Sequence, residues 1–224
     1  MRIKVRNFPL VFRVLIMAVA MGIVCELRAQ KPSTAVENYL GFSVDCSEFA
    51  DDARIAELRA AIHEQIDIVC SVGLPEEVQG FFKSVPMRLF SGRTALGNTP
   101  GLYSAETRAI ELTAAVLKAG HKPVLLHELL HAYHHQKIPG GFDNKVILKF
   151  YKEGKSANCF TAKSHMMDNA KEYFACCATT YLFGVTAQPP FRREKVQSLQ
   201  PDFYTYISSL FGPTTGNFEG SLER

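Results

Sequence analysis

The chain carries one segment from which its architecture follows, Val124-Leu-Leu-His127-Glu128-Leu-Leu-His131-Ala-Tyr-His134-His135. Pro123 suits a first helical position, and no glycine or proline follows before Pro139, so we expect a helix here. The leucines and Tyr133 would give this helix a broad apolar surface that packs into a core.

The polar residues of this helix have the spacing of a metal site. Residues four apart lie on one face of a helix, so His127 and His131 can present two imidazoles to one ion, and Glu128 leans over the same site. This HExxH arrangement suits Zn²⁺, because neutral imidazoles bind the ion and the carboxylate can take a proton from bound water. The other interpretation is a core helix with hydrogen-bonded histidines, although buried polar groups are costly unless paired or bound.

A catalytic zinc ion with two histidine ligands needs a third protein ligand. Metzincins have a histidine or aspartate ten residues after the first histidine, and this chain has Lys137 there, which excludes that class. Glu172, in the first turn of a later helix, is the best-placed carboxylate. Acidic residues in a first turn also serve as dipole or capping partners, so both roles stay open.

A segment around Glu172 resembles a known family. Asn169-Ala-Lys-Glu172-Tyr-Phe-Ala175, followed by Tyr181 and Gly184, is similar to the E-[YF]-F-A helix of the anthrax lethal factor-like zinc peptidases. This gluzincin group includes the Pro-Pro endopeptidases. The resemblance covers roughly residues 101 to 184, including the HELLH segment.

The resemblance implies a zinc-dependent endopeptidase of zincin-like fold. It implies that His127, His131 and Glu172 bind zinc and that Glu128 is the general base. Zinc would polarise the scissile carbonyl and lower the pKa of its water toward about 7, while Glu128 takes the proton and passes it to the leaving amine.

The chain departs from the family pattern at two positions. Where the family commonly has a tyrosine, seven positions before the ligand glutamate, the chain has His165, and where an acidic residue often follows the F-A pair it has Cys176. A histidine can donate an N–H to the developing oxyanion, so His165 is a candidate catalytic residue if the ligand helix extends back over Asp168. A solvent-exposed loop histidine is the alternative, with Tyr173 as a weaker substitute donor. Cys176 indicates a missing or altered contact around the metal ligands.

Residues 1 to 29 have the layout of a secretory signal peptide. Basic residues precede an apolar run from Val14 to Cys25, and Leu27-Arg-Ala29 precedes Gln30. Because this run of twelve residues is shorter than the roughly twenty that span a membrane, we expect a secreted or periplasmic protein. Anchoring through an uncleaved leader is the alternative.

The charge of the chain belongs mostly to this leader. The whole sequence has 25 basic and 22 acidic residues, a formal charge of +3, and without the leader's five basic residues and one acidic residue the charge is −1. No basic run with interleaved aromatic residues remains, so we expect a peptide or protein substrate and no nucleic-acid partner. No stable membrane insertion is expected after removal of the leader.

Residues 30 to 211 are expected to form a single α+β domain, mainly helical, with a small antiparallel sheet or hairpin before the HExxH helix, and residues 212 to 224 a flexible tail. Residues 30 to 46 have no clear pattern and are expected to be irregular. Other elements are expected as helices at 51–69, 75–83, 144–153, 169–183, 192–199 and 202–211, and strands at 85–90, 101–104 and 108–113. Asp168 can cap the 169–183 helix, and Gly154 is expected to end the 144–153 helix.

The last of these strands, residues 108 to 113, could run beside the site and accept an extended peptide as an added strand, although an ordinary edge strand fits equally.

Two functions of other classes also remain open. One is a secreted zinc-binding module without turnover, against which the retained Glu128 argues. The other is a zinc amidase acting on a non-protein amide.

The cysteines do not define a disulfide framework. Five remain after the leader: Cys46, Cys70, Cys159, Cys176 and Cys177. The odd count leaves at least one thiol free or paired outside the chain. A bridge between Cys46 and Cys70 is disfavoured, because the intervening helix would hold its ends about 28 Å apart.

Overall fold

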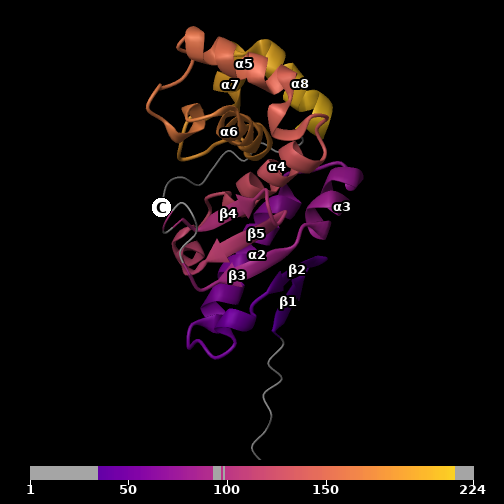
Figure 1. Cartoon of the computed structure of the whole chain (residues 1–224), viewed down its shortest axis with the longest axis vertical. Helices are drawn as coiled ribbons and strands as arrows, with labels where there is room; N and C mark the ends of the chain where they lie inside the picture. The colour runs from indigo at the N-terminus through magenta and orange to yellow at the C-terminus, as the bar shows by residue number, and fades with distance from the viewer. Residues whose placement is uncertain (1–34, 93–96, 98, 215–224) are drawn as a thin grey trace, which may run out of the picture. The chain divides into compact units, whose positions relative to one another are not determined.

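The computed structural model describes residues 35–92, 97 and 99–214, which form one compact α+β unit (Figure 1). The expected α+β class is confirmed. The expected signal peptide lies outside the described residues, as do residues 215 to 224 of the expected tail. Within the described ranges, no helix has the length and apolar character needed to cross a membrane.

The described residues contain one five-stranded sheet with the order β1-β2-β3-β5-β4. Its strands are β1 (Val36–Tyr39), β2 (Phe42–Asp45), β3 (Met87–Phe90), β4 (Gly101–Ser104) and β5 (Ala109–Thr113). The hairpin β4–β5 is antiparallel as expected, but the sheet is mixed, because β3 pairs in parallel with both β2 and β5. Two helices connect β2 to β3, and such a crossover returns the chain in the same direction.

The expectation that residues 30 to 46 are irregular is wrong from Val36 onward. Strands β1 and β2 form a hairpin whose two turn residues, Leu40 and Gly41, have φ of 47° and 86°. Positive φ at both positions is the geometry that joins two antiparallel strands with little distortion. The sequence does not indicate this hairpin, because each strand has only four residues and leucine is not a typical turn residue.

The helices that follow agree with the expected segments to within a few residues at their ends. They are α2 (Ile55–Ser71), α3 (Glu76–Ser84), α4 (Val124–Gln136), α5 (Lys145–Ser156), α6 (Ala170–Phe183), α7 (Arg193–Leu199) and α8 (Pro201–Phe211). Short 3-10 turns lie between them: η1 (Ser47–Phe49), η2 (Ala114–Lys118), η3 (Gly141–Asp143) and η4 (His165–Met167).

The predicted end of the helix at residues 144–153 is wrong. Helix α5 continues through Gly154 to Ser156, so this glycine does not end the helix. A Cβ at Gly154 would lie 2.8 Å from the Tyr173 hydroxyl and 2.9 Å from Nε2 of Gln200. The glycine therefore serves close packing of α5 against α6 and the segment between α7 and α8.

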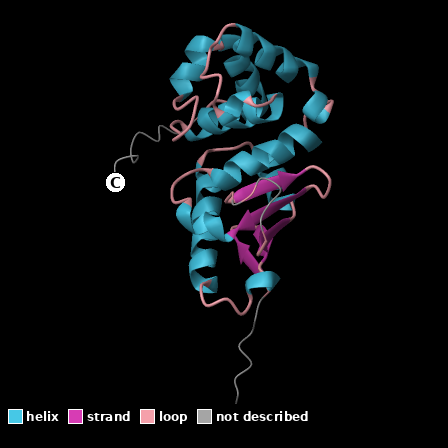
Figure 2. Cartoon of the chain, turned by 60° about the vertical axis from the view of Figure 1, so that its left-hand side comes forward, coloured by secondary structure: helices cyan, strands magenta, loops and turns pink. Residues whose placement is uncertain are grey.

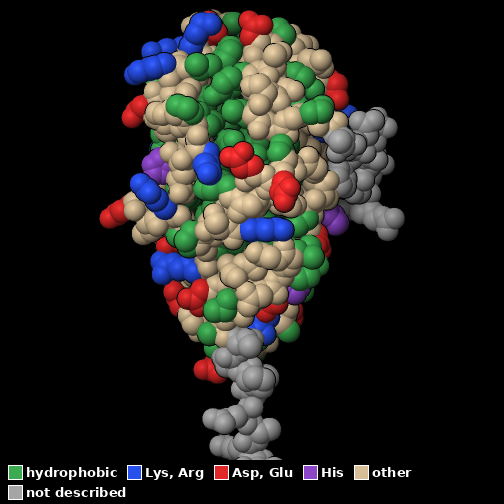
Figure 3. All heavy atoms as spheres, turned by 90° about the vertical axis from the view of Figure 1, so that its right-hand side faces the viewer, with side chains coloured by type: hydrophobic (Ala, Val, Ile, Leu, Met, Phe, Trp, Pro, Cys, Tyr) green, Lys and Arg blue, Asp and Glu red, His purple; other side chains and the backbone are tan. Residues whose placement is uncertain are grey.

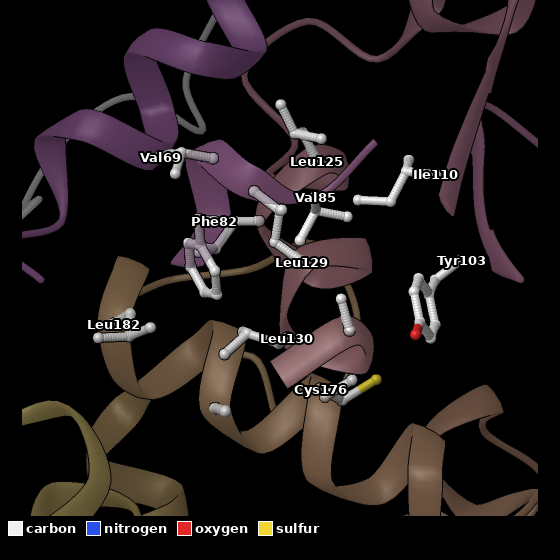
Figure 4. Packing of buried hydrophobic residues seen from close by; sticks show 14 of the residues in the cluster. Val69, Phe82, Val85, Tyr103, Ile110, Leu125, Leu129, Leu130, Cys176 and Leu182 are labelled. Atoms are coloured by element: carbon white, nitrogen blue, oxygen red, sulfur yellow. The ribbon is translucent and has the colours of Figure 1, made fainter. Parts of the chain in front are cut away.

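Helix α4 lies at the centre of the unit, between the sheet and the helices α5 to α8 (Figures 1 and 2). Leu125, Leu129 and Leu130 are fully buried. Figure 4 shows Leu125 and Leu129 on the side of the sheet and Leu130 on the side of Leu182 in α6. The helix thus has apolar contacts on two sides, as its leucine-rich sequence predicts.

A buried glutamine holds the start of α4. Oε1 of Gln65, on α2, accepts the N–H of Leu125 at 3.1 Å, and its Nε2 donates to the carbonyls of Gly120 and Lys122 at 2.9 and 3.0 Å. The first bond satisfies an N–H group that a helix start leaves without an intrahelical partner, and the other two tie down the segment that precedes the helix. They also fix α4 relative to α2.

The surface carries charges of both signs. On the face in Figure 3, Lys and Arg side chains are interspersed with Asp and Glu side chains. Mixing at this scale keeps the local field small, because opposite charges compensate within a Debye length.

The second histidine pair of α4 includes a fully buried imidazole. His134 packs against the rings of Phe142 and Phe174, with centroids 5.2 and 4.7 Å away. In the described part of the chain neither of its ring nitrogens has a well-formed hydrogen bond. Burial, with the nearby charge of His131, lowers the pKa of His134 to about 3.

His134 is therefore expected to make the protein sensitive to acid. Its pKa is about 6.5 when unfolded and about 3 when folded, so the unfolded chain binds the proton more readily between these values. Protonation of His134 alone should lower the free energy of unfolding by about 1.4 kcal/mol for each pH unit as the pH drops from about 6.5 toward about 3. His134→Leu should remove that slope in urea unfolding of the metal-free protein measured from pH 7 to pH 4. His121→Leu, at a side chain that is 77% exposed, is the control, and parallel curves for wild type and His134→Leu would refute the assignment.

Candidate metal centre

Three ligand atoms predicted from sequence come together between α4 and α6. Nε2 of His127 lies 3.1 Å from Nε2 of His131, and Oε2 of Glu172 lies 3.3 and 3.2 Å from these two atoms. Tetrahedral bonds of 2.0 to 2.1 Å place neighbouring ligand atoms about 3.3 Å apart. The three side chains thus fit one face of a tetrahedral zinc site.

Helix α6 is held at both ends, which fixes the position of Glu172. Oδ1 of Asn169 accepts the N–H groups of Lys171 and Glu172, both at 3.0 Å, so Asn169 and not Asp168 caps the helix. At the other end Arg193 donates to the carbonyls of Tyr181 and Leu182. Glu172 is in the first turn as predicted, but the capping role belongs to Asn169.

The electrostatics of the cluster favour positive charge where the ligand atoms meet. Burial opposes ionisation of Glu172, but hydrogen bonds with His127 and His131 outweigh it and hold the pKa of this carboxyl well below its usual range. Burial also lowers the pKa of His127, yet contacts with Cys176 and Glu172 raise it well above its ordinary value. A divalent cation supplies such a positive charge.

Glu128 lies beside this cluster and is anchored by the sheet. The residue is 8% exposed, and its Oε2 accepts the backbone N–H of Tyr103, on β4, at 2.8 Å. The phenol of Tyr103 in turn pairs with Nδ1 of His135 at 2.9 Å. Sequence reasoning missed this anchor, because a backbone donor leaves no signature in residue type.

A glycine permits the close approach of β4 to the helix. A Cβ at Gly101 would lie 3.1 Å from Cγ of Glu128 and 3.2 Å from Cγ1 of Val124. Contacts this short require the neighbours to move, and Glu128 is one of them. Gly101 is thus a second site residue that sequence reasoning missed.

His165 also reaches the cluster. Its Nε2 lies 3.0 Å from Oε2 of Glu172, and its Nδ1 lies 2.8 Å from Oδ2 of Asp168. Helix α6 does not extend back over Asp168, the condition under which a role for His165 was considered, since His165 lies in the separate turn η4. That turn brings the imidazole to the site, with its side chain 48% exposed.

The ligand atoms of His127, His165 and Glu172 also lie within 4.8 Å of one another, so His165 is close enough to count as a possible ligand. His131 is the better third member, because its Nε2 lies 3.1 Å from Nε2 of His127 and its side chain is only 9% exposed, whereas the side chain of His165 is 48% exposed. Tyr173 is excluded as a substitute donor. It is fully buried, its hydroxyl donates to Oε1 of Gln200, and it does not line the cavity beside the cluster.

The cluster opens into a cavity of about 770 Å³. The residues that line it include members of strand β4, the start of α4, α6 and the segment 186 to 189. The strand beside the site is therefore β4 and not the last strand β5, because β5 lies inside the sheet between β3 and β4. Only an edge strand has backbone groups free to pair with a further strand.

Comparisons with known proteins add a structural likeness. No protein-family model matches the chain, and no curated protein matches it. Among solved structures, the chain is similar to the Pro-Pro endopeptidase from Paenibacillus alvei, with a TM-score of 0.48 and 16% sequence identity. The alignment covers 70% of this chain and 92% of that one.

Gly101→Val is expected to lower the free energy of unfolding by about 1 to 3 kcal/mol, because the added methyl groups overpack the contact between β4 and α4. Gly80→Ala on α3 is the control, since a Cβ there meets nothing within 4 Å, and it should stabilise the helix by up to about 1 kcal/mol. Chemical denaturation measures both. Equal stability of Gly101→Val and wild type would show that β4 does not need this close approach.

Proposed function

We propose that this protein is a secreted or periplasmic zinc-dependent endopeptidase. The observation that carries the proposal is the set of three ligand atoms 3.1 to 3.3 Å apart, with the carboxylate of Glu128 beside them in an open cavity. A purely structural zinc site is closed by four protein ligands. A site of three ligands with a neighbouring carboxylate is typical of hydrolysis.

Zinc supplies a Lewis acid and lowers the pKa of a bound water toward about 7. Glu128 is the proposed general base, and it takes a proton from the attacking water and later passes it to the leaving amine. The N–H of Tyr103 holds Oε2 of Glu128, which leaves Oε1 to handle the proton.

His165 is the proposed donor to the oxyanion. A half-exposed imidazole at the edge of the cavity can give an N–H to the substrate carbonyl oxygen as negative charge develops. Asp168 accepts from Nδ1 and orients the ring, so that Nε2 is the nitrogen directed at the cluster. The donor position taken by a family tyrosine is thus available to a histidine here.

The proposed substrate is a peptide in extended conformation. Strand β4 lies at the sheet edge and lines the cavity, so its outward backbone groups can pair with an added strand. The N–H of Tyr103 points out of the sheet toward Glu128. A peptide placed along β4 would therefore pass directly over the general base.

Glu128→Gln should retain zinc and folding while losing most hydrolysis of an unbiased peptide library. Glutamine keeps an oxygen that can accept from the N–H of Tyr103, but it cannot take a proton. His131→Ala is the matched comparison and should lose the metal as well, because it removes a ligand. Zinc content and library digestion are measured on the same samples, with and without a chelator. Wild-type turnover by Glu128→Gln would overturn the mechanism, and a wild-type protein that binds zinc without cleaving any peptide would favour a binding module.

His165→Phe should lower kcat and kcat/KM together by about 10² while zinc stays bound, because the donor acts in the transition state. His165→Tyr restores a donor and should recover part of the rate. His121→Phe, at an exposed histidine outside the cavity, should change neither quantity. A loss of zinc affinity in His165→Phe would instead identify His165 as a ligand.

A further inference from the structure

Tyr103 contacts helix α4 at two places. Its backbone N–H donates to Oε2 of Glu128 at 2.8 Å. Its phenol oxygen lies 2.9 Å from Nδ1 of His135 and accepts from Nε2 of Gln136 at 3.0 Å. Glu128 and His135 are seven residues apart, so they lie on the same face of α4, about 10 Å apart along its axis. One residue of β4 therefore bridges two turns of the helix.

The phenol of Tyr103 accepts in one of its two bonds and donates in the other. An amide nitrogen can only donate, so the phenol oxygen accepts from Gln136. The hydroxyl proton is then directed at Nδ1 of His135, which can accept it when the imidazole is neutral. Burial, with the charges of Arg108 and Lys171, lowers the pKa of His135 and so favours the neutral imidazole. Because Tyr103 is buried, water competes little for either bond.

Strand β4 needs anchors of this kind, because it is short and lies at the edge of the sheet. It has four residues and pairs with β5 on one side. It also contacts α4, where Gly101 permits a close approach to Val124 and Glu128. A donor and an acceptor about 3.6 Å apart no longer form a hydrogen bond. A movement of β4 by less than about 1 Å would therefore break the 2.8 Å bond from Tyr103 to Glu128.

We propose that the phenol of Tyr103 is a positioning group for the proposed general base. Its bonds to His135 and Gln136 fix β4 against α4. The N–H of Tyr103 then stays on Oε2 of Glu128, and Oε1 is left for the proton. This role depends on the proposed peptidase function, because only a carboxylate that handles a proton in the reaction requires such exact placement.

Tyr103→Phe keeps the ring and removes both phenol bonds. It should lower kcat by about 10-fold at unchanged zinc content, because a misplacement of 1 Å can cost up to about 10²-fold in rate. Tyr181→Phe is the matched control. Tyr181 is also buried, and its hydroxyl donates to the carbonyl of Gly212 at 2.6 Å, outside the cavity. This control should lower the melting temperature and leave kcat unchanged.

A double-mutant cycle separates the placement of Glu128 from a general loosening of the fold. Glu128→Asp keeps a base but shortens the side chain, which draws the carboxylate away from the N–H of Tyr103. In this background Tyr103→Phe should have little further effect on kcat, because the group through which the phenol acts is already displaced. Equal factors in both backgrounds would mean that the phenol only stabilises the fold, and the positioning role would be wrong.

Amide hydrogen exchange, measured by NMR on the zinc-free protein, tests the same contact without turnover. Tyr103→Phe should speed exchange of the amide at position 103 by about 10-fold, because the bond to Glu128 opens more often. The amide of Ile110, the partner of Tyr103 on β5, donates to the carbonyl of Pro86 at 2.8 Å and should keep its protection. Unchanged exchange at position 103, or an equal loss of protection at both amides, would contradict the positioning role.

Failure of the proposed function has a different signature. A wild-type protein that binds zinc but cleaves no member of an unbiased peptide library would overturn the peptidase function and the positioning role together. An active wild type whose kcat equals that of Tyr103→Phe would overturn the positioning role alone.

Discussion

The close approach of α6 to α4 is the contact on which the rest of the structure depends. It brings a carboxylate of one helix within 3.3 Å of two imidazoles of the other, in a region where unpaired polar groups are costly. Any shift of one helix along the other by part of a turn would separate the ligand atoms, so both helices must be anchored independently.

The anchors are hydrogen bonds from outside each helix. Gln65 of α2 holds the start of α4, Asn169 caps α6, and Arg193 satisfies carbonyls at the end of α6. Each bond satisfies a helix-end group that would otherwise lack a partner. The same bonds stabilise the fold and hold the candidate ligand atoms of the proposed metal site in place.

Helix α6 shows how one element can serve core and site together. Glu172 and Cys176 lie on its cavity side, while Tyr173 and Cys177 are completely buried on the other side. The hydroxyl of Tyr173 bonds Gln200, and Gly154 leaves room for that pair. His134 of α4 differs from these residues, because its buried ring nitrogens have no well-formed hydrogen-bond partner in the described chain. Its lowered pKa means that acid should decrease the stability of the folded protein.

The sequence by itself determined the features that depend on near neighbours along the chain. The spacing of His127, Glu128 and His131 places them on one turn of helix, and leucine periodicity and capping residues mark the helices to within a few residues, because these signals are local. Tertiary structure alone decided what depends on distant partners. The N–H of Tyr103 on Glu128 joins positions 25 apart through a backbone group common to every residue. The place of β4 at the sheet edge depends on the arrangement of all five strands, and His165 approaches Glu172 from a separate turn. Such contacts leave no pattern in the order of residues, since they arise only when packing brings the elements together.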